Sequence, residues 1–129
     1  TADAARAAVT ALAKSLGRQP SVLVVGGNER QRRHHQRLDK LGKEWGFEGE
    51  WLMTNYTSPQ KTVSTIGDRL KNGVDLLILL HWNRHETTEP ALEIARSCDV
   101  SARTVHYAGF TSLQVALAEQ WQRMTPVAS

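Results

Sequence analysis

Short apolar segments alternate with amphipathic segments along most of this 129-residue chain, and this alternation limits the folds open to it. Four segments carry the apolar and β-branched residues that favour strands: 22–25, 47–54, 74–80 and 103–107. Apolar residues at helical spacing follow each one, in residues 28–45, 58–73, 87–98 and 111–124. Strands that alternate with helices predict a parallel sheet with helices on both faces.

Right-handed connections then decide the order of the strands. They place the second strand on one side of the first and the third on the other side, which predicts the order 2-1-3-4. The sequence therefore predicts an α/β fold: a small three-layer domain of the Rossmann-like or flavodoxin-like kind, with a four-stranded parallel sheet.

An extra helix is expected before the first strand. Residues 3–16 are alanine-rich, with Ala5, Val9 and Leu12 on one face, and Gly17 is a suitable residue to end the helix. Because the chain starts with Thr1 inside this pattern, we expect residues 1–17 to be a helix that continues an upstream region of a longer protein. Residues 18–129 are then the α/β domain.

Composition bears on three properties of the protein: membrane insertion, disulfide bonding and charge. No apolar run approaches the roughly 18 residues that a membrane span needs. Cys98 is the only cysteine, which excludes an internal disulfide and fits a reducing, cytoplasmic setting. The net charge of +3 permits an acidic partner without requiring one.

A ligand site is expected where the first and third strands end, because open α/β sheets bind ligands outside the carboxyl ends of their strands at the point where strand order reverses. A glycine turn followed by a helix can present backbone N–H groups to a phosphate, and Arg30 can add a bidentate contact. The alternative is a tight turn without a ligand. The candidate ligand- or phosphate-binding residues are Gly26, Gly27, Asn28, Arg30, His81, Asn83, His85, Thr111 and Ser112.

Three side chains have two interpretations each. His34 lies on the apolar stripe of its helix, where it is either a packed residue bonded to a backbone carbonyl or part of the site. His34 and His85 are the candidate general acids or bases. Together with Cys98 they have the chemistry of metal ligands but lack a local ligand spacing, and Cys98 otherwise belongs to the core.

Basic residues are concentrated in residues 30–43, where Arg32, Arg33 and Arg37 precede two lysines and Asp39 is the only acid. Such a helix is either a solvated face or a surface for an acidic partner, most naturally nucleic acid.

Several of these residues match a known pattern. The segment VLVVGG at 22–27 resembles the opening strand and glycine pair of a bacterial family known only as domain of unknown function twenty-three twenty-five. The residues that stand where the family has a similar residue are His34, His85, Cys98 and Ser112-Leu113. In place of the family's histidine-aspartate-glycine-glycine turn this chain has residues 55–58 (NYTS), and Arg84 replaces the serine that usually precedes the second histidine. The resemblance covers about residues 21–120 and implies a Rossmann-like fold, often joined to other domains, with no known reaction.

Three functions are expected from these features. The first is a nucleotide- or nucleic-acid-binding module with its anion at the junction of the first and third strands. The second is a phosphodiester or nucleotide hydrolase assisted by histidine or metal. The third is a domain for oligomerisation or for contacts with other domains. The sequence names no cofactor.

Overall fold

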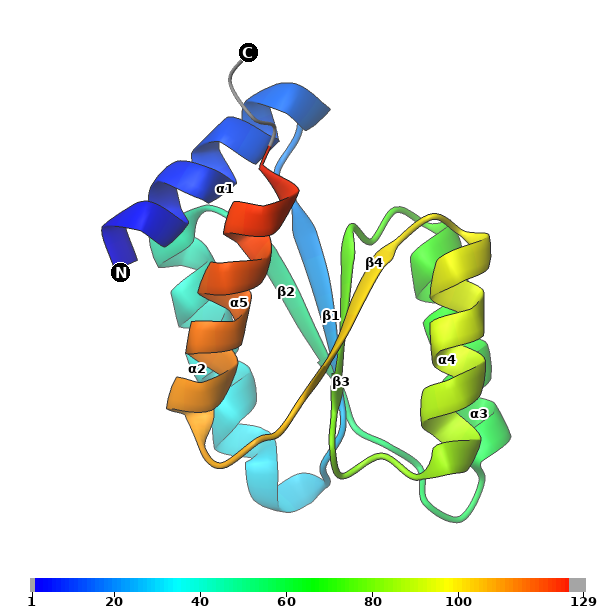
Figure 1. Cartoon of the computed structure of the whole chain (residues 1–129). Coiled ribbons are helices and arrows are strands. Elements are labelled where there is room, and N and C mark those ends of the chain that lie inside the picture. The colour runs from blue at the N-terminus through cyan, green and yellow to red at the C-terminus, as the bar shows by residue number, and fades with distance from the viewer. Residues whose placement is uncertain (1, 126–129) are drawn as a thin grey trace.

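The four strands form one parallel sheet between two layers of helices in the computed structural model, which describes residues 2–125 (Figure 1). The elements in chain order are α1 (Ala2–Leu16), β1 (Ser21–Val25), the short 3-10 helix η1 (Glu29–Gln31), α2 (Arg32–Trp45), β2 (Glu48–Leu52), α3 (Pro59–Lys71), β3 (Leu76–Leu80), α4 (His85–Ser97), β4 (Ser101–Val105) and α5 (Phe110–Met124). Among the described residues, no helix has both the length and the apolar character needed to cross a bilayer.

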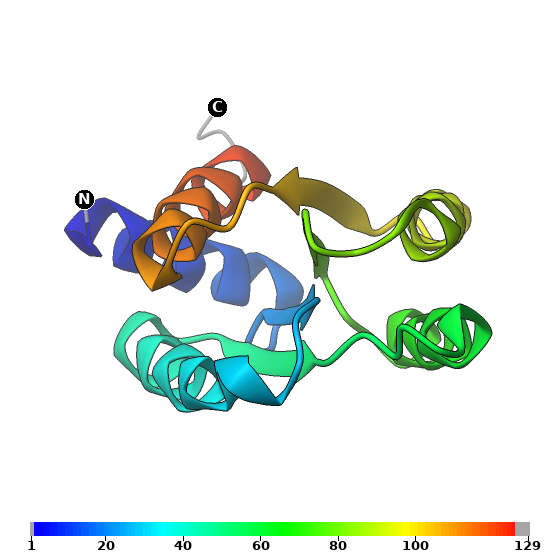
Figure 2. The ribbon, with the colours of Figure 1, turned by 90° about the horizontal axis from the view of Figure 1, so that it is seen from below.

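The strand order β2-β1-β3-β4 confirms the predicted order. All neighbouring strands are parallel, and the register aligns Val25 of β1 with Leu52 of β2 and with Leu79 of β3. α1, α2 and α5 cover one face of the sheet, and α3 and α4 cover the other (Figures 1 and 2). The carboxyl ends of the strands therefore meet at one edge, which Figure 2 views from below.

The core divides between the two faces because side chains alternate along each strand. Val22 and Val24 pack with the α1, α2 and α5 layer, whereas Leu23 and Val25 pack with α3 and α4. Every residue of β3 is buried, as expected for a central parallel strand that is covered on both faces.

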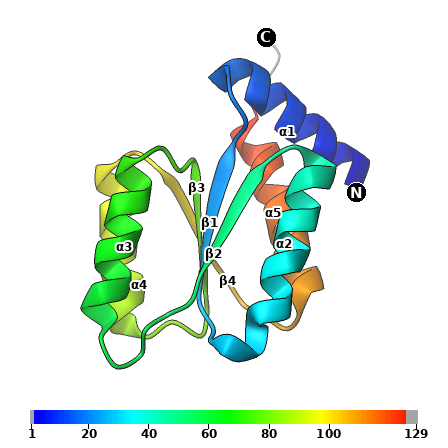
Figure 3. The same ribbon diagram turned by 180° about the vertical axis from the view of Figure 1, so that it is seen from behind.

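The first helix packs into this core and does not stand apart from it. Ala5 and Val9 are buried in the same cluster as Trp121 of α5, and α1 lies beside α2 and α5 (Figure 3). Gly17 ends the helix in the left-handed region with a φ of 72°, which confirms the predicted end. Whether the helix continues upstream stays a prediction.

Several predicted boundaries are wrong by a few residues. α4 begins at His85, and Thr87 lies inside its first turn, because the carbonyl of Arg84 accepts the N–H groups of both Thr87 and Thr88 at 2.9 Å. α5 begins at Phe110, one residue before the predicted start at 111. β4 ends at Val105 and not at residue 107, since the ladder with β3 ends where Leu80 pairs with Val105.

Candidate functional site

Four loops meet at the carboxyl edge of the sheet, as predicted: residues 26–28 after β1, 53–58 after β2, 81–84 after β3 and 106–109 after β4. α2, α4 and α5 start at this edge, which is the lower end of the molecule in Figure 1.

The junction between β1 and β3 is occupied by the chain itself. The side-chain amide of Asn83 donates to the carbonyl of Val25 at 2.8 Å and to that of Leu80 at 3.0 Å. The buried hydroxyl of Thr54 donates to the Asn83 amide oxygen. Asn83, a predicted ligand residue, therefore ties together the ends of two strands and the loop after β2.

The two glycines are required by packing and by backbone conformation. A Cβ at Gly26 would lie 2.7 Å from the Cβ of Leu80, and its φ of 145° is rarely adopted by other residues. The N–H of Gly26 donates to Leu52 at 3.0 Å, and its carbonyl accepts the indole N–H of Trp51 at 2.8 Å. Gly27 has a φ of 81°, in the left-handed region.

The amides after the glycines are also bonded within the turn. The N–H of Asn28 donates to the side-chain oxygen of Gln31 at 2.7 Å, and the N–H of Arg30 donates to the side-chain oxygen of Asn28 at 2.9 Å. These bonds resemble a capping box, although they close η1 and not the first turn of α2. Anion binding by this turn stays a prediction, and the turn's internal hydrogen bonds do not favour it.

Tyr107, which the sequence interpretation left inside a strand, organises the other half of the edge. Its hydroxyl lies 2.5 Å from Nδ1 of His34, and its backbone N–H donates to Nδ1 of His81 at 2.8 Å. Its ring packs edge-on against Trp82 and Trp51, with centroids 4.9 and 5.8 Å away. Tyr107 thus connects the loops after β3 and β4 with α2.

The electrostatics of the His34–Tyr107 pair favour neutral forms. Partial burial lowers the pKa of His34, and the nearby Arg37 and Arg33 lower it further. Burial raises the pKa of Tyr107 to about 12, against the opposing influence of Arg37. At neutral pH the neutral phenol and the neutral imidazole therefore share one hydrogen bond between the hydroxyl and Nδ1. His34 is a packed residue, but its partner is a hydroxyl and not the predicted backbone carbonyl.

Two further histidines form an exposed pair at the same edge. His81 follows β3 and His106 follows β4, and their rings stack with centroids 4.2 Å apart and planes inclined by 28°. Both side chains are exposed. His106 was not among the predicted site residues, because the predicted strand 103–107 included it.

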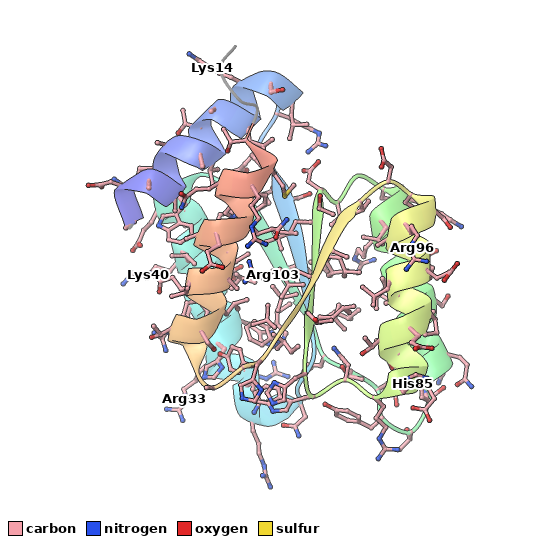
Figure 4. All side chains as sticks on the ribbon, viewed as in Figure 1. Lys14, Arg33, Lys40, His85, Arg96 and Arg103 are labelled. Atoms are coloured by element: carbon pink, nitrogen blue, oxygen red, sulfur yellow. The ribbon has the colours of Figure 1, made fainter. Side chains whose placement is uncertain are left out.

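The structure does not bring His34, His85 and Cys98 together. His85 begins α4 and Cys98 follows its last residue, so about 20 Å of helix separates them. His85 pairs with Glu89 at 3.1 Å and lies on the opposite side of the sheet from Arg33 (Figure 4). Within residues 2–125, no three His, Cys, Asp or Glu side chains are grouped to hold a metal ion.

The basic residues of α2 fall on two different rows of the helix. Arg33, Arg37 and Lys40 are spaced i, i+4 and i+7 and share one exposed row, here called the basic row. Figure 4 shows Arg33 and Lys40 along the same outer side of α2. Arg32 is rotated by about 100° from Arg33 and shares its row with Asp39, so it lies outside the basic row. Contact of all three arginines with nucleic acid stays a prediction.

The basic row has no close ion-pair partner among the described side chains, although the exposed Glu44 follows Lys40 by four residues on the same row. Among the side chains that the structure describes, no carboxylate lies within 4.0 Å of Arg33, Arg37 or Lys40. The guanidinium of Arg37 lies 4.4 Å from the ring centre of Phe110 at the start of α5, which fixes the middle of the row by a cation–π contact.

Ser112 and Thr111 have different roles at the start of α5. The Ser112 hydroxyl donates to the carbonyl of Gly109 at 2.6 Å and accepts the N–H of Ala108 at 3.1 Å, so it closes the turn before the helix. Thr111 is exposed.

A hollow of about 580 Å³ lies away from this edge, beside the outer strand β2. Its walls carry charges of both signs from Asp39, Lys43, Glu48, Glu50 and Arg69. The hollow therefore favours neither an anionic nor a cationic ligand, and it contains none of the predicted site residues.

Comparisons with known proteins place the chain in no family. No protein-family model matches it, and the curated proteins contain no match. The resemblance noted from residues 21–120 therefore stays a prediction.

Proposed function

We propose that this chain is a nucleic-acid-binding module that contacts the phosphate backbone through the basic row of α2. The observation that carries the proposal is the alignment of Arg33, Arg37 and Lys40 on one exposed face without a carboxylate within 4.0 Å among the described side chains. Like charges at i, i+4 destabilise a helix by about 0.2–0.5 kcal/mol, and a bound anion would remove that repulsion.

The dimensions of the row support a polymeric anion. From Arg33 to Lys40 the helix rises by roughly 10 Å. Each strand of a B-form duplex carries one phosphate for about each 3.4 Å of its axis, and by this measure the row spans roughly three phosphates. Arg37 is held in place by Phe110, which reduces the side-chain entropy lost when a phosphate binds.

A nucleic acid is favoured over a nucleotide held at the glycine turn. Asn83 occupies the junction of β1 and β3, and the N–H groups of Gly26, Asn28 and Arg30 already have partners within the chain. The basic row has no such partner in the described part of the chain.

The test measures the binding of fluorescently labelled single-stranded dT12 by anisotropy from 50 to 300 mM salt. The variant Arg33→Gln/Arg37→Gln/Lys40→Gln is compared with Lys14→Gln/Lys71→Gln/Arg96→Gln. The control removes the same charge from the ends of α1, α3 and α4, at the amino edge of the sheet (Figure 4). For a single strand, losing three phosphate contacts should flatten the plot of log affinity against log salt by about 2 units.

The expected result is micromolar to submillimolar binding by the wild type and the control, with weaker and less salt-dependent binding by the variant of the basic row. Equal affinities and salt slopes for the two triple variants would overturn the proposal, and so would the absence of binding at 50 mM salt.

A further inference from the structure

The stacked imidazoles of His81 and His106, here called the histidine platform, are a second exposed feature of the carboxyl edge. Phosphate contacts along α2 do not account for them. Their position follows from the sheet, because each histidine directly follows one member of the last residue pair of the β3–β4 ladder, Leu80 and Val105. The two rings stack at 4.2 Å while both side chains remain exposed.

One hydrogen bond fixes the backbone of His81 and a second orients its ring. Its backbone N–H donates to the carbonyl of Val105 at 2.9 Å, and its Nδ1 accepts the N–H of Tyr107 at 2.8 Å. Because Nδ1 is an acceptor, the neutral ring carries its proton on Nε2. The ring centre of Trp82 lies 5.4 Å from that of His81.

His106 presents the open side of the platform. One face of its ring lies against His81, and among the described residues no other aromatic ring contacts it. A flat ring that is already stacked on one face and exposed to solvent on the other can accept a further flat ring at little entropic cost.

We propose that the histidine platform stacks against an unpaired base, so that the ligand of this module is single-stranded DNA or RNA. This inference rests on the proposed function, since the basic row would supply the phosphate contacts. Tyr107 links the two surfaces: it follows His106 in the chain, and its hydroxyl lies against His34, which is the residue after Arg33. Arg37 also lies over the ring of Phe110, whose centre is 6.3 Å from that of His34.

The choice of a single strand follows from the chemistry of stacking. In a duplex, each base is stacked on its neighbours and its faces are not available to the protein. In a single strand a base can turn outward, stack on an aromatic or imidazole ring, and leave its phosphates on a neighbouring basic surface.

The test compares labelled dT12 and U12 single strands with a 12-base-pair duplex at the same salt concentration. The main variant is His106→Ala, because no other part of the described chain uses the His106 side chain as a hydrogen-bond partner. His106→Phe restores a flat ring without an imidazole. Leu16→Ala removes an exposed apolar side chain at the amino edge and serves as the control.

The expected result is tighter binding of the single strands than of the duplex. His106→Ala should weaken single-strand binding about five- to one-hundred-fold and leave its salt slope unchanged, whereas His106→Phe and Leu16→Ala should bind like the wild type. A preference for dT12 or for U12 would show which of the two strands the module binds more tightly.

Two results would overturn this inference alone while the variant of the basic row still loses affinity: equal binding of duplex and single strand, or wild-type affinity of His106→Ala for both single strands. If His106→Phe fails as His106→Ala does, ring stacking is also refuted. If the triple variant of the basic row instead binds with the same affinity and salt slope as its control, the proposed function is refuted.

Discussion

Replacing Tyr107 with Phe removes one hydroxyl and keeps the ring that packs against Trp82 and Trp51. The hydroxyl lies 2.5 Å from Nδ1 of His34, which is partly buried. A neutral hydrogen bond contributes about 1 kcal/mol net, and a partly buried nitrogen left without a partner adds up to about 1 kcal/mol. We therefore expect the free energy of unfolding to fall by about 1–2 kcal/mol, which lowers the melting temperature by about 4–8 °C.

The assay is urea unfolding followed by tryptophan fluorescence, combined in a double-mutant cycle with His34→Ala. The cycle should give a coupling energy of about 1 kcal/mol between residues 34 and 107, because only the wild type contains both partners. Tyr56→Phe, at the protein's other tyrosine, should change the stability by less than about 0.5 kcal/mol. A coupling energy near zero would refute the description of Tyr107 as the residue that connects α2 to the loop after β4.

Three other substitutions test separate parts of the fold. Asp75→Asn removes the negative charge and one of the two acceptor oxygens that Arg18 contacts at 2.7 Å. Burial raises the pKa of Asp75, but the hydrogen bonds from Arg18 and Ser21 outweigh burial and lower it. The wild type should therefore lose this stabilisation as pH falls from about 4 through that lowered pKa, and urea unfolding at pH 7 and pH 3 should show that the variant lacks this loss. Gly26→Ala should lower the free energy of unfolding, measured by thermal unfolding, by about 2–4 kcal/mol, because its Cβ would meet a β3 side chain at 2.7 Å. Gly67→Ala, in the middle of α3, is the control and should be neutral or stabilising by up to about 1 kcal/mol. Thr87→Val should raise stability by about 1 kcal/mol in calorimetry, since the buried hydroxyl has no hydrogen-bond partner among the described residues, and a loss of stability would contradict that description.

The sheet was predictable because each strand can be recognised from its own short run of residues. The apolar run that became β3 has no polar residue, which is typical of a central parallel strand, and the handedness of the connections then leaves one order for the strands. The position of the four loops at one edge follows from the parallel direction of the strands. Gly26 and Gly27 were correctly identified as the residues that end β1 in a turn.

The partners of the site residues were not predictable in the same way. The bonds from Asn83 to Val25 and Leu80 depend on the register between strands that are far apart in sequence. His106 and Tyr107 were assigned to the predicted strand, because only pairing with β3 shows that β4 ends at Val105. A histidine placed on the apolar stripe of α2 was a signal that it had a buried partner, but the sequence did not show that the partner lay in the β4 loop.

The most direct measurement of the central claim is a titration of ¹⁵N-labelled protein with dT12, followed by amide chemical shifts in NMR. The proposed binding surface predicts that the largest changes map to the basic row, Arg33, Arg37 and Lys40, and to the histidine platform, His81 and His106. The hollow beside β2 should remain unchanged. Changes confined to that hollow, or the absence of changes at a tenfold excess of dT12, would contradict the account.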